Sequence, residues 1–291
     1  MQSRLKVTSE VTSEVVSKLA IIGGGNMATA LINGLCAAKQ EIGEILVVDT
    51  QTSTLQALQQ RFGTQITLRT STQIDAQLAE ADAIILAVKP QQLSAVAQQL
   101  APFCAQQLVL SIAAGIRASD LARWLGGYQK IVRSMPNTPA MIGRGVSGLF
   151  ALPEVSASQR QIAENLLRAV GEIIWLDDEN LMDAVTAVSG SGPAYVFYFI
   201  EAMQQAALDL GLTAEHAKIL SLATFQGAAQ LAAESSEEIH VLRERVTSKG
   251  GTTYAALSSM EQHQVKAAIM TAIQAAATRG KQLGDEFGQS A

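Results

Sequence analysis

Short apolar runs alternate with longer segments of helical spacing over the first 177 residues. Most of these runs end at a glycine, a proline or a polar residue, as buried strands do. The expected strands are 18–22, 45–49, 66–68, 82–88, 108–112, 130–135, 145–152 and 172–176. Strands that alternate with helices imply a doubly wound, mostly parallel sheet with right-handed crossovers. We therefore expect an α/β domain over residues 18–177.

The strand pattern stops after residue 177, and the remaining segments have helical spacing. The expected helices are 179–188, 192–210, 213–234, 236–245 and 252–283, separated by glycine and serine. The segment 192–210 carries apolar residues on more than one face, which indicates burial on several sides. The chain is 48% hydrophobic and only 16% charged, and a monomer would have to cover every such face within one small domain. Residues 178–291 are therefore expected to form an all-helical domain that makes an obligate homodimer.

Residues 1–17 precede the first expected strand. They contain a short polar repeat, Val7-Thr-Ser-Glu10-Val11-Thr-Ser-Glu14, and no apolar segment typical of a secretory signal. The chain has no uninterrupted apolar run of about 18 residues, so no membrane span is expected. We interpret residues 1–17 as a flexible extension, with an extra edge strand as the alternative, and expect the protein in the cytoplasm.

Charge and metal-ligating residues narrow the class of function. The net charge is −5, and no cluster of lysine and arginine is interleaved with aromatic residues, which argues against nucleic-acid binding. Cys36 and Cys104 lie in apolar runs and are expected to be free thiols. His216, His240 and His263 are scattered on polar segments. The sequence therefore predicts no metal site.

The turn after the first strand contains three consecutive glycines. Gly23, Gly25 and Ala28 occupy the positions of the pattern G-x-G-x-x-A, between an expected strand and an expected helix. In such turns the second glycine admits a pyrophosphate, and the helix N-terminus favours the phosphate charge. A glycine-rich turn without a ligand is the alternative. The setting in a doubly wound domain favours a Rossmann-type dinucleotide site.

Asp49 ends the second expected strand, near the place where such sites put a carboxylate for the adenosine ribose. The alternative, a cap for the helix that follows, would need the aspartate slightly later in the chain. A carboxylate at this point repels a 2′-phosphate, and no arginine follows in residues 50–53. These features predict that NADH is usable as well as NADPH.

Two loops at the expected ligand edge allow both a functional and a structural interpretation. Lys89, before Pro90, could neutralise a phosphate or could be a solvated lysine at the end of a strand. In the segment 135–140, two prolines exclude regular structure, and Asn137 and Thr138 supply short polar side chains. A site role is somewhat favoured for this segment over a plain connecting turn.

Two polar stretches of the helical domain could carry chemistry. Residues 189–195 place small residues between two helices, and residues 246–253 combine two glycines with four hydroxyl residues before a helix. Consecutive N–H groups there, with the hydroxyls of Thr252 and Thr253, would suit a substrate carboxylate. A helix end followed by a helix start is the alternative. No acid–base pair has a useful spacing, which fits hydride transfer from a cofactor.

Six short motifs in order resemble those of the pyrroline-5-carboxylate reductase family, from about residue 18 to residue 283. They are Ile22-Gly-Gly-Gly-Asn-Met-Ala28, Ala87-Val-Lys-Pro90, Ser111-Ile-Ala-Ala-Gly115, Met135-Pro-Asn-Thr-Pro-Ala140, Val185-Thr-Ala-Val-Ser-Gly-Ser-Gly-Pro-Ala-Tyr195 and Val246-Thr-Ser-Lys-Gly-Gly-Thr-Thr253. The resemblance implies reduction of (S)-1-pyrroline-5-carboxylate to L-proline by NADPH or NADH, the last step of proline biosynthesis. It also implies a dimerisation domain interlocked with that of a partner, and decamers in some members.

Positions of individual site residues follow from the same resemblance. The cofactor would contact Gly23, Gly24, Gly25, Asn26, Met27, Ala28, Asp49, Ala87, Val88, Lys89, Pro90, Ala113, Ala114 and Gly115. The substrate would contact Glu179, Ser189, Ser191, Gly250, Gly251, Thr252 and Thr253. Thr253 matches a threonine proposed to lie near the imine nitrogen, so it is the candidate catalytic residue.

Two positions depart from the family pattern. Lys249 stands where the family usually has proline, and Asp49 stands where the family often lacks a carboxylate. A related imine or 3-hydroxy-acid reductase remains an alternative, although the hydroxy-acid enzymes place a lysine on the first helix of the helical domain and residues 179–188 contain none. A nucleotide-sensing oligomer is the other alternative, and it gives the loop at 250–253 no purpose.

Overall fold

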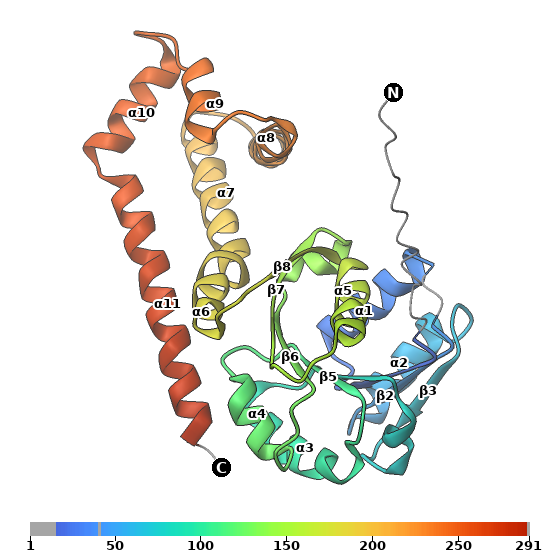
Figure 1. The fold of residues 1–291 in the computed structure, drawn as a ribbon. Helices are drawn as coiled ribbons and strands as arrows, with labels where there is room; N and C mark the ends of the chain where they lie inside the picture. The colour runs from blue at the N-terminus through green and yellow to red at the C-terminus, as the bar shows by residue number, and fades with distance from the viewer. Residues whose placement is uncertain (1–15, 40–41, 290–291) are drawn as a thin grey trace, which may run out of the picture. The chain divides into compact units, whose positions relative to one another are not determined.

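The computed structural model describes residues 16–39 and 42–289 and contains one mixed sheet with helices on both faces (Figure 1). Eight strands pair in the order β3-β2-β1-β4-β5-β6-β7-β8. The strands are β1 (Lys18–Ile22), β2 (Glu44–Val48), β3 (Leu68–Ser71), β4 (Ala83–Leu86), β5 (Leu108–Ser111), β6 (Ile131–Met135), β7 (Gly145–Ala151) and β8 (Gly171–Trp175). The helices are α1 (Asn26–Ala37), α2 (Thr52–Phe62), α3 (Pro90–Leu100), α4 (Ala118–Trp124), α5 (Ala157–Arg168), α6 (Met182–Val185), α7 (Gly192–Asp209), α8 (Ala214–Glu234), α9 (Ile239–Arg245), α10 (Thr252–Gln262) and α11 (Val265–Gln289).

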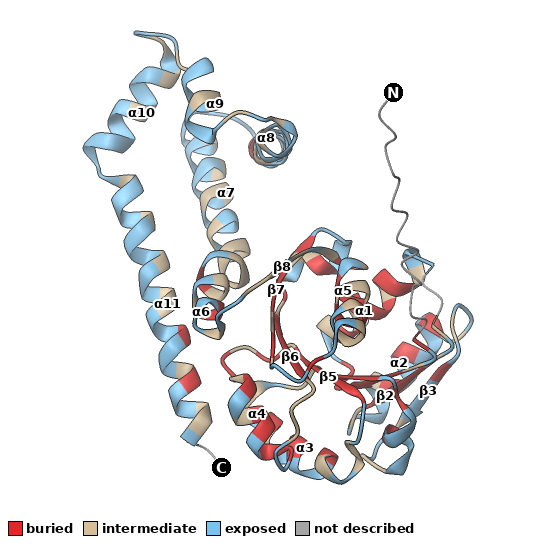
Figure 2. Cartoon of the chain, in the orientation of Figure 1, coloured by how far each residue is buried: buried red, intermediate tan, exposed pale blue. Residues whose placement is uncertain are grey.

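Alternate residues of the central strands feed two separate cores, one on each face of the sheet. In β1, Leu19 and Ile21 join the core that also takes side chains from α1, α2 and α5. Ala20 and Ile22 join the core on the other face, with side chains from α3 and α4. Figure 2 shows the buried residues concentrated on these strands and helix faces. Burial on both faces explains why the strands are continuous apolar runs, and it confirms the doubly wound architecture.

Two strands, β7 and β8, run against the other six, which still leaves the mostly parallel sheet that was expected. β7 is antiparallel to β6 and parallel to β8, whereas the pairs from β3 to β6 are all parallel. The connection from β6 to β7 is a short 3-10 turn, Thr138–Ile142, whose first residues include the second proline of the segment 135–140. A short connection of this kind suits an antiparallel neighbour, because a parallel one needs a long crossover.

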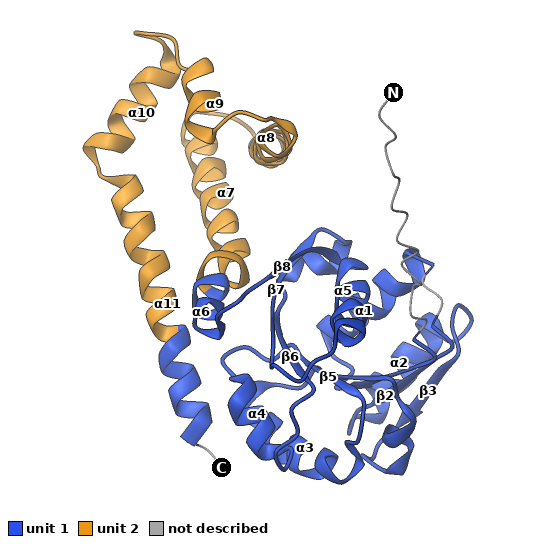
Figure 3. Ribbon diagram, viewed as in Figure 1, with its two compact units in different colours: residues 1–186, 280–291 blue, residues 187–279 orange. Residues whose placement is uncertain are grey.

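The chain divides into two compact units (Figure 3). The first contains the described residues up to Thr186 together with those from Gly280 onward, and the second contains Ala187–Arg279. This division differs from the expected boundary at 177/178 at both ends of the helical region. The reason is packing: α6 contacts β7, and the last turns of α11 contact the β5–α4 segment.

The second unit buries very few of its own side chains. Helices α7, α9 and α10 have no buried residue, and α8 buries only Ala217 and Ser221. Seventeen of the twenty-one large apolar residues that are exposed in the described chain belong to this unit, among them Phe197, Tyr198 and Leu210. An exposed apolar surface of this extent marks an interaction face.

Several element boundaries differ from the expected ones. The helical pattern over 252–283 is two helices, because Gln264 adopts a left-handed backbone with φ 54° between α10 and α11, and α11 continues to Gln289. The segment 179–188 is a 3-10 turn, the short helix α6 and a π-helical turn that ends at Gly190.

The N-terminal extension lies outside the described residues except for its last two. Val16 is buried in the core under α1, and Ser17 donates its N–H to Asp82 Oδ2 at 2.7 Å. The folded chain therefore begins at least two residues before the boundary expected at Lys18.

Candidate active site

The glycine turn between β1 and α1 requires glycine at its first position. Gly23 has φ 102°, donates its N–H to Val48 O at 2.7 Å, and would place a Cβ only 2.7 Å from Ala87 O. Ala28 is fully buried, so only a small residue lets α1 approach the sheet. Gly25, at the start of α1, is exposed and supplies no side-chain cap. The first turn of α1 therefore presents its N–H groups at the carboxyl edge of the sheet.

The Asp49 carboxylate holds the glycine turn and the β2–α2 loop together. Its Oδ2 accepts from Gly24 N at 2.7 Å, and its Oδ1 accepts from Gln51 N at 2.8 Å. The residue that caps α2 is Gln51, so Asp49 does not occupy the helix-cap position. From Ile45 to Gln60 the sequence has no lysine or arginine that could pair with a phosphate.

The remaining expected cofactor loops lie on neighbouring strands at the same edge. Ala87–Pro90 follows β4, where Ala87 N donates to Ile22 O at 2.8 Å and exposed Lys89 precedes Pro90 at the start of α3. Ala113–Gly115 follows β5 and ends in a left-handed glycine, Gly115, with φ 74°. Because β2, β1, β4 and β5 are consecutive in the sheet, the structure brings the fourteen expected cofactor residues to one edge of a parallel sheet, where such ligands bind.

A polar hollow beside Asp49 was not expected from the sequence. It has a volume of about 440 Å³ and lies between the start of α2 and the end of β3. Its lining is Thr52, Leu55, Gln56, Gln59, Thr70, Ser71 and Thr72. The signal was missed because β3 is mostly polar (Leu-Arg-Thr-Ser) and was expected two residues too early, at 66–68.

Glu179 is held inside the first unit by a buried cation. Its Oε1 accepts from Arg133 Nη1 at 2.8 Å and from the backbone N–H of Ala118 at 2.7 Å. The Arg133 side chain is only 6% exposed, and it is the one charged residue in the apolar strand β6. A single arginine in an apolar strand is the one feature of the sequence that indicates a buried partner of opposite charge. One carboxylate oxygen of Glu179 is thus committed to α4 and β6.

Asn137 has a structural contact in the loop after β6. Its Oδ1 accepts from Val146 N at 3.0 Å, which fixes the start of β7 relative to the loop. This contact agrees with the interpretation of the segment 135–140 as a connecting turn, and it leaves the site role of that segment a prediction.

The loop before α10 is a tight glycine turn at the start of a helix. Gly250 has φ 74°, and Gly251 is the residue before the first helical turn, with no side-chain cap. A Cβ on Gly251 would lie 2.5 Å from Ser248 Oγ, so the turn is tightly folded. The N–H groups of Thr252 and Thr253 begin the helix, and Lys249 beside them is exposed.

The other expected substrate residues of the second unit lie far from this loop within one chain. Ser191 begins α7, and Ser189 lies in the π-helical turn just before it. The eighteen residues of α7 span about 27 Å. Figure 1 shows the yellow start of α7 and the orange loop before α10 at opposite ends of these helices. A single chain therefore does not bring the two groups of substrate residues together.

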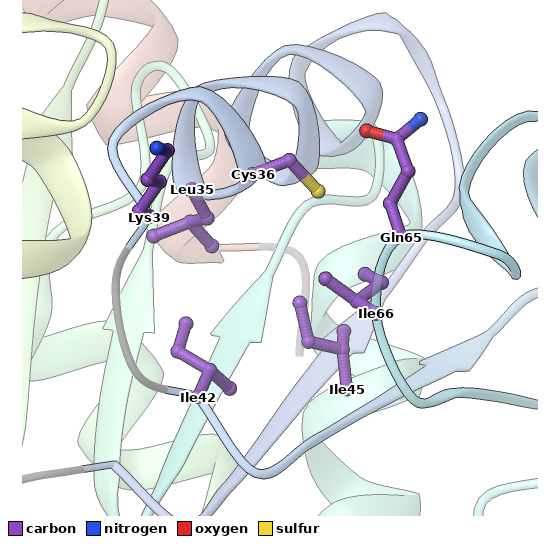
Figure 4. Close-up of a pocket in the computed structure, with 7 residues that line it drawn as sticks. All are labelled: Leu35, Cys36, Lys39, Ile42, Ile45, Gln65 and Ile66. Carbon is purple, nitrogen blue, oxygen red and sulfur yellow. The ribbon is translucent and has the colours of Figure 1, made fainter.

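A second cavity lies at the opposite edge of the sheet (Figure 4). It has a volume of about 260 Å³ and is formed at the end of α1 and the starts of β2 and β3. It is lined by Leu35, Cys36, Lys39, Ile42, Ile45, Gln65 and Ile66. Helix ends and strand starts lie at the amino edge of a parallel sheet, so this cavity is separate from the cofactor loops.

Neither of the two thiols is activated for chemistry at this site. Burial raises the pKa of the Cys36 thiol, and burial raises the pKa of the Cys104 thiol to about 11. Both cysteines are free, as expected. Within residues 16–39 and 42–289, no three histidine, cysteine, aspartate or glutamate side chains gather as metal ligands would. Over the same ranges, no helix has the length and apolarity needed to cross a membrane.

Comparisons with known proteins agree with both halves of this description. Residues 179–283 match the family described as pyrroline-5-carboxylate reductase dimerisation, and residues 18–115 match NADP oxidoreductase coenzyme F420-dependent. The pyrroline-5-carboxylate reductase of Pseudomonas aeruginosa is 44% identical over 94% of this chain and 98% of its own length. That of Pasteurella multocida is 40% identical over 92% and 98%.

Solved structures show the same relationship in three dimensions. A pyrroline-5-carboxylate reductase from Coxiella burnetii matches with a TM-score of 0.85 and 38% identity, over 92% of this chain and 98% of that one. The Plasmodium falciparum enzyme, solved with NADP bound, matches with a TM-score of 0.80 and 29% identity, over 94% and 99%. The identity over nearly the whole length, with the dimerisation domain in place, indicates a homo-oligomer and an NAD(P)-dependent oxidoreductase. The chain belongs to the pyrroline-5-carboxylate reductase family.

Proposed function

We propose that the protein reduces (S)-1-pyrroline-5-carboxylate to L-proline with NADPH or NADH, as the last step of proline biosynthesis in the cytoplasm. The observation that carries this proposal is the convergence of the expected cofactor loops on one sheet edge, in a chain whose relatives bear the name of this enzyme. The glycine turn fits a dinucleotide, because Gly23 and Ala28 are both fixed by close contacts and the helix start beyond them is exposed.

The residues of the first unit bind and orient the dinucleotide in this proposal. Gly23 to Ala28 hold the pyrophosphate, and Asp49 accepts hydrogen bonds from the adenosine ribose. Ala87 to Pro90 and Ala113 to Gly115 line the half of the site that receives the nicotinamide. When bound, the dinucleotide supplies a hydride to the imine carbon of the substrate.

The residues of the second unit bind the substrate. The N–H groups of Gly250 to Thr253 hold its carboxylate at the start of α10. The Thr253 hydroxyl contacts the imine nitrogen and, with solvent, supplies the proton that the reduced nitrogen carries. Ser189, Ser191 and Glu179 flank the same substrate. Because the start of α7 and the loop before α10 lie at opposite ends of the long helices of one chain, a complete substrate site in this proposal needs two chains.

We therefore propose an interlocked homodimer in which one chain supplies the loop 250–253 to the other, with a decamer of five dimers as the larger assembly. The exposed apolar surface of α7 and α8 supports this proposal. The proposed reaction requires the imine substrate, the dinucleotide and a second copy of the chain, and it involves no nucleic acid or membrane.

The direct test is oxidation of NADH and of NADPH by the purified protein with pyrroline-5-carboxylate, in parallel with a 3-oxo acid. We expect turnover with the imine and none with the oxo acid. Failure to turn over the imine with either dinucleotide would remove this proposal. Turnover of the oxo acid alone would favour a hydroxy-acid reductase.

Asp49 sets the second test, because its carboxylate would repel a 2′-phosphate. We expect kcat/KM with NADH to equal or exceed that with NADPH in the unmodified enzyme. Asp49→Ser should shift the ratio toward NADPH by about tenfold, since one hydrogen-bonded charge is worth about 1.5–3 kcal/mol. A clear preference of the unmodified enzyme for NADPH would show that Asp49 serves only to hold the glycine turn.

A further inference from the structure

The end of helix α11 packs on the segment that connects β5 to α4. Although α11 has 25 residues, its buried residues are two glycines, Gly280 and Gly284. Glycine inside a helix costs about 1 kcal/mol relative to alanine, so its presence at a buried position indicates close approach by another part of the chain. At Gly284 that neighbour is the backbone of Gly115.

The contacts between α11 and this turn are specific. A Cβ on Gly284 would lie 3.4 Å from Gly115 O and 3.4 Å from Arg117 Nη2. In return, a Cβ on Gly115 would lie 3.3 Å from Leu283 Cβ and 3.4 Å from the ring of Phe287. Gly284 thus has room for a methyl group at ordinary contact distance but not for a large side chain, and Gly115 packs on the side chains of Leu283 and Phe287.

Polar contacts and an aromatic anchor extend this packing to the next two turns. Arg117 Nη2 donates to Asp285 Oδ1 at 2.5 Å, and Arg123 Nη2 donates to Gly288 O at 2.6 Å. Phe287 packs against the apolar core that contains Ile116 and Ala118. The ion pair is half exposed and contributes little by itself, so the packing of Gly284 and Phe287 carries the contact.

The same segment is held from a second direction. Ala118 N donates to Glu179 Oε1, which is paired with the buried Arg133. Gly115, by contrast, has a left-handed backbone and no side chain, so its conformation depends on its neighbours. The segment that follows the turn is therefore held by Glu179 at Ala118, and the last residue of the turn, Gly115, is held by α11.

We propose that the last turns of α11, Gly280–Gln289, brace the turn Ala113–Gly115 and so position it for the nicotinamide half of the dinucleotide, with Gly284 and Phe287 as positioning residues. The inference rests on the proposed function, in which this turn contacts the cofactor. In a doubly wound domain the first three strands take the adenosine half and the next three take the other half. Loss of the contact between α11 and this turn should therefore weaken binding of the nicotinamide half of the dinucleotide and leave binding of the adenosine half unchanged.

The experiment measures the Kd of NADH and the Kd of ADP, a probe for the adenosine half, on the free full-length enzyme. The leucine of Gly284→Leu cannot fit beneath Gly115 and should displace the turn. We expect the Kd of NADH to rise about tenfold, which corresponds to about 1.4 kcal/mol of lost binding free energy, and the Kd of ADP to change less than about twofold. Phe287→Ala should raise the Kd of NADH by about threefold in the same way.

Two matched controls use the same helix. Gly284→Ala adds a methyl group at ordinary contact distance, and Lys281→Leu places the large side chain on an exposed position. Both should leave the two Kd values within about twofold of the unmodified enzyme. The KM for pyrroline-5-carboxylate at saturating NADH should also stay unchanged in all four variants, which a general loss of structure would not allow.

Three outcomes would overturn the inference. These are unchanged NADH binding in both Gly284→Leu and Phe287→Ala, an equal loss of NADH and ADP binding, and weakened NADH binding in Lys281→Leu. If Gly284→Leu does not fold, Phe287→Ala decides alone. Failure of the proposed function would appear separately, as an unmodified enzyme that binds no NADH or reduces no imine.

Discussion

The two units of the chain reach stability in different ways. The first buries its apolar residues in two layers that its own helices cover, and its buried Arg133 is paired with Glu179. The second has long helices with exposed Phe197, Tyr198, Leu210 and Leu231 and almost no buried residue. The contrast teaches that the packing of the first unit can be judged from one chain, whereas the apolar helices of the second unit need a partner copy to cover them.

The largest effect is expected from a substitution that disrupts the proposed dimer interface of the second unit. Phe197 is 65% exposed in a single chain, and in the proposed dimer its ring is buried. Phe197→Asp should abolish the dimer and reduce kcat/KM by at least about a hundredfold, because an aromatic anchor worth about 2–4 kcal/mol is replaced by an unpaired charge. Light scattering of the eluted protein and the reductase assay measure both effects.

A charge added to the first unit is the control. Gln98→Asp on the exposed side of α3 should leave the mass and the activity unchanged. A Phe197→Asp enzyme that stays a dimer with full activity would mean that α7 is not an interface, and the contrast between the units would then need another explanation.

A smaller effect is expected at the proposed substrate loop. Thr253→Ala should raise the KM for pyrroline-5-carboxylate and lower kcat/KM by about 1–3 kcal/mol, the range for one lost hydrogen bond to a charged group. Binding of NADH to the free enzyme should not change, since the proposed dinucleotide site lies in the first unit. Steady-state kinetics and a direct binding measurement separate the two, and wild-type kinetics would exclude Thr253 from the site.

The smallest expected effect is a loss of stability at alkaline pH that depends on the cysteine thiols. It concerns the first unit alone, because both cysteines of the chain belong to that unit. Burial raises the pKa of Cys104 from 9.0 to about 11, so the unfolded thiol ionises first as pH rises. The contribution of Cys104 to stability is complete below pH 9.0 and declines between that value and about pH 11. For a partly exposed thiol the loss is about 1 kcal/mol.

Thermal unfolding at pH 8, 9.5 and 10.5 measures this decline, with the pH values chosen to span roughly the two pKa values. Cys104→Ala should flatten the dependence. Cys36→Ala should flatten it less, because a backbone hydrogen bond opposes the effect of burial on the pKa of that thiol. An identical pH dependence in the unmodified protein and Cys104→Ala would show that other groups control alkaline unfolding.

The sequence allowed most of the first unit to be predicted, because its strands are apolar runs and its turns need particular residues. The glycine turn is an example, since the close approach of Ala87 O to Gly23 excludes any other residue. β3 was misplaced because a polar edge strand has no such pattern. Glu179 was assigned through family position to the substrate, and its pairing with Arg133 depends on a contact between distant parts of the chain that spacing does not reveal.

The second unit shows where prediction from one chain stops. Wide apolar stripes indicated an oligomer, but they do not say which faces meet or which loop crosses to the partner. The attachment of the last turns of α11 to the first unit was also missed, because glycines in a helix are usually interpreted as weak points. Here Gly280 and Gly284 are buried contacts.

The first unit is made of two separate stretches of the chain, and this has a consequence for folding during synthesis. The ribosome has already extended the chain through the whole helical region when the residues from Gly280 onward emerge. Domains usually fold in order from the N-terminus during synthesis, yet this one lacks its last helical turns until translation is almost finished. A chain truncated near its C-terminus would have a nearly complete first unit, but the turn after β5 would be loose. Proteases that cleave exposed loops would therefore distinguish it from the full-length protein.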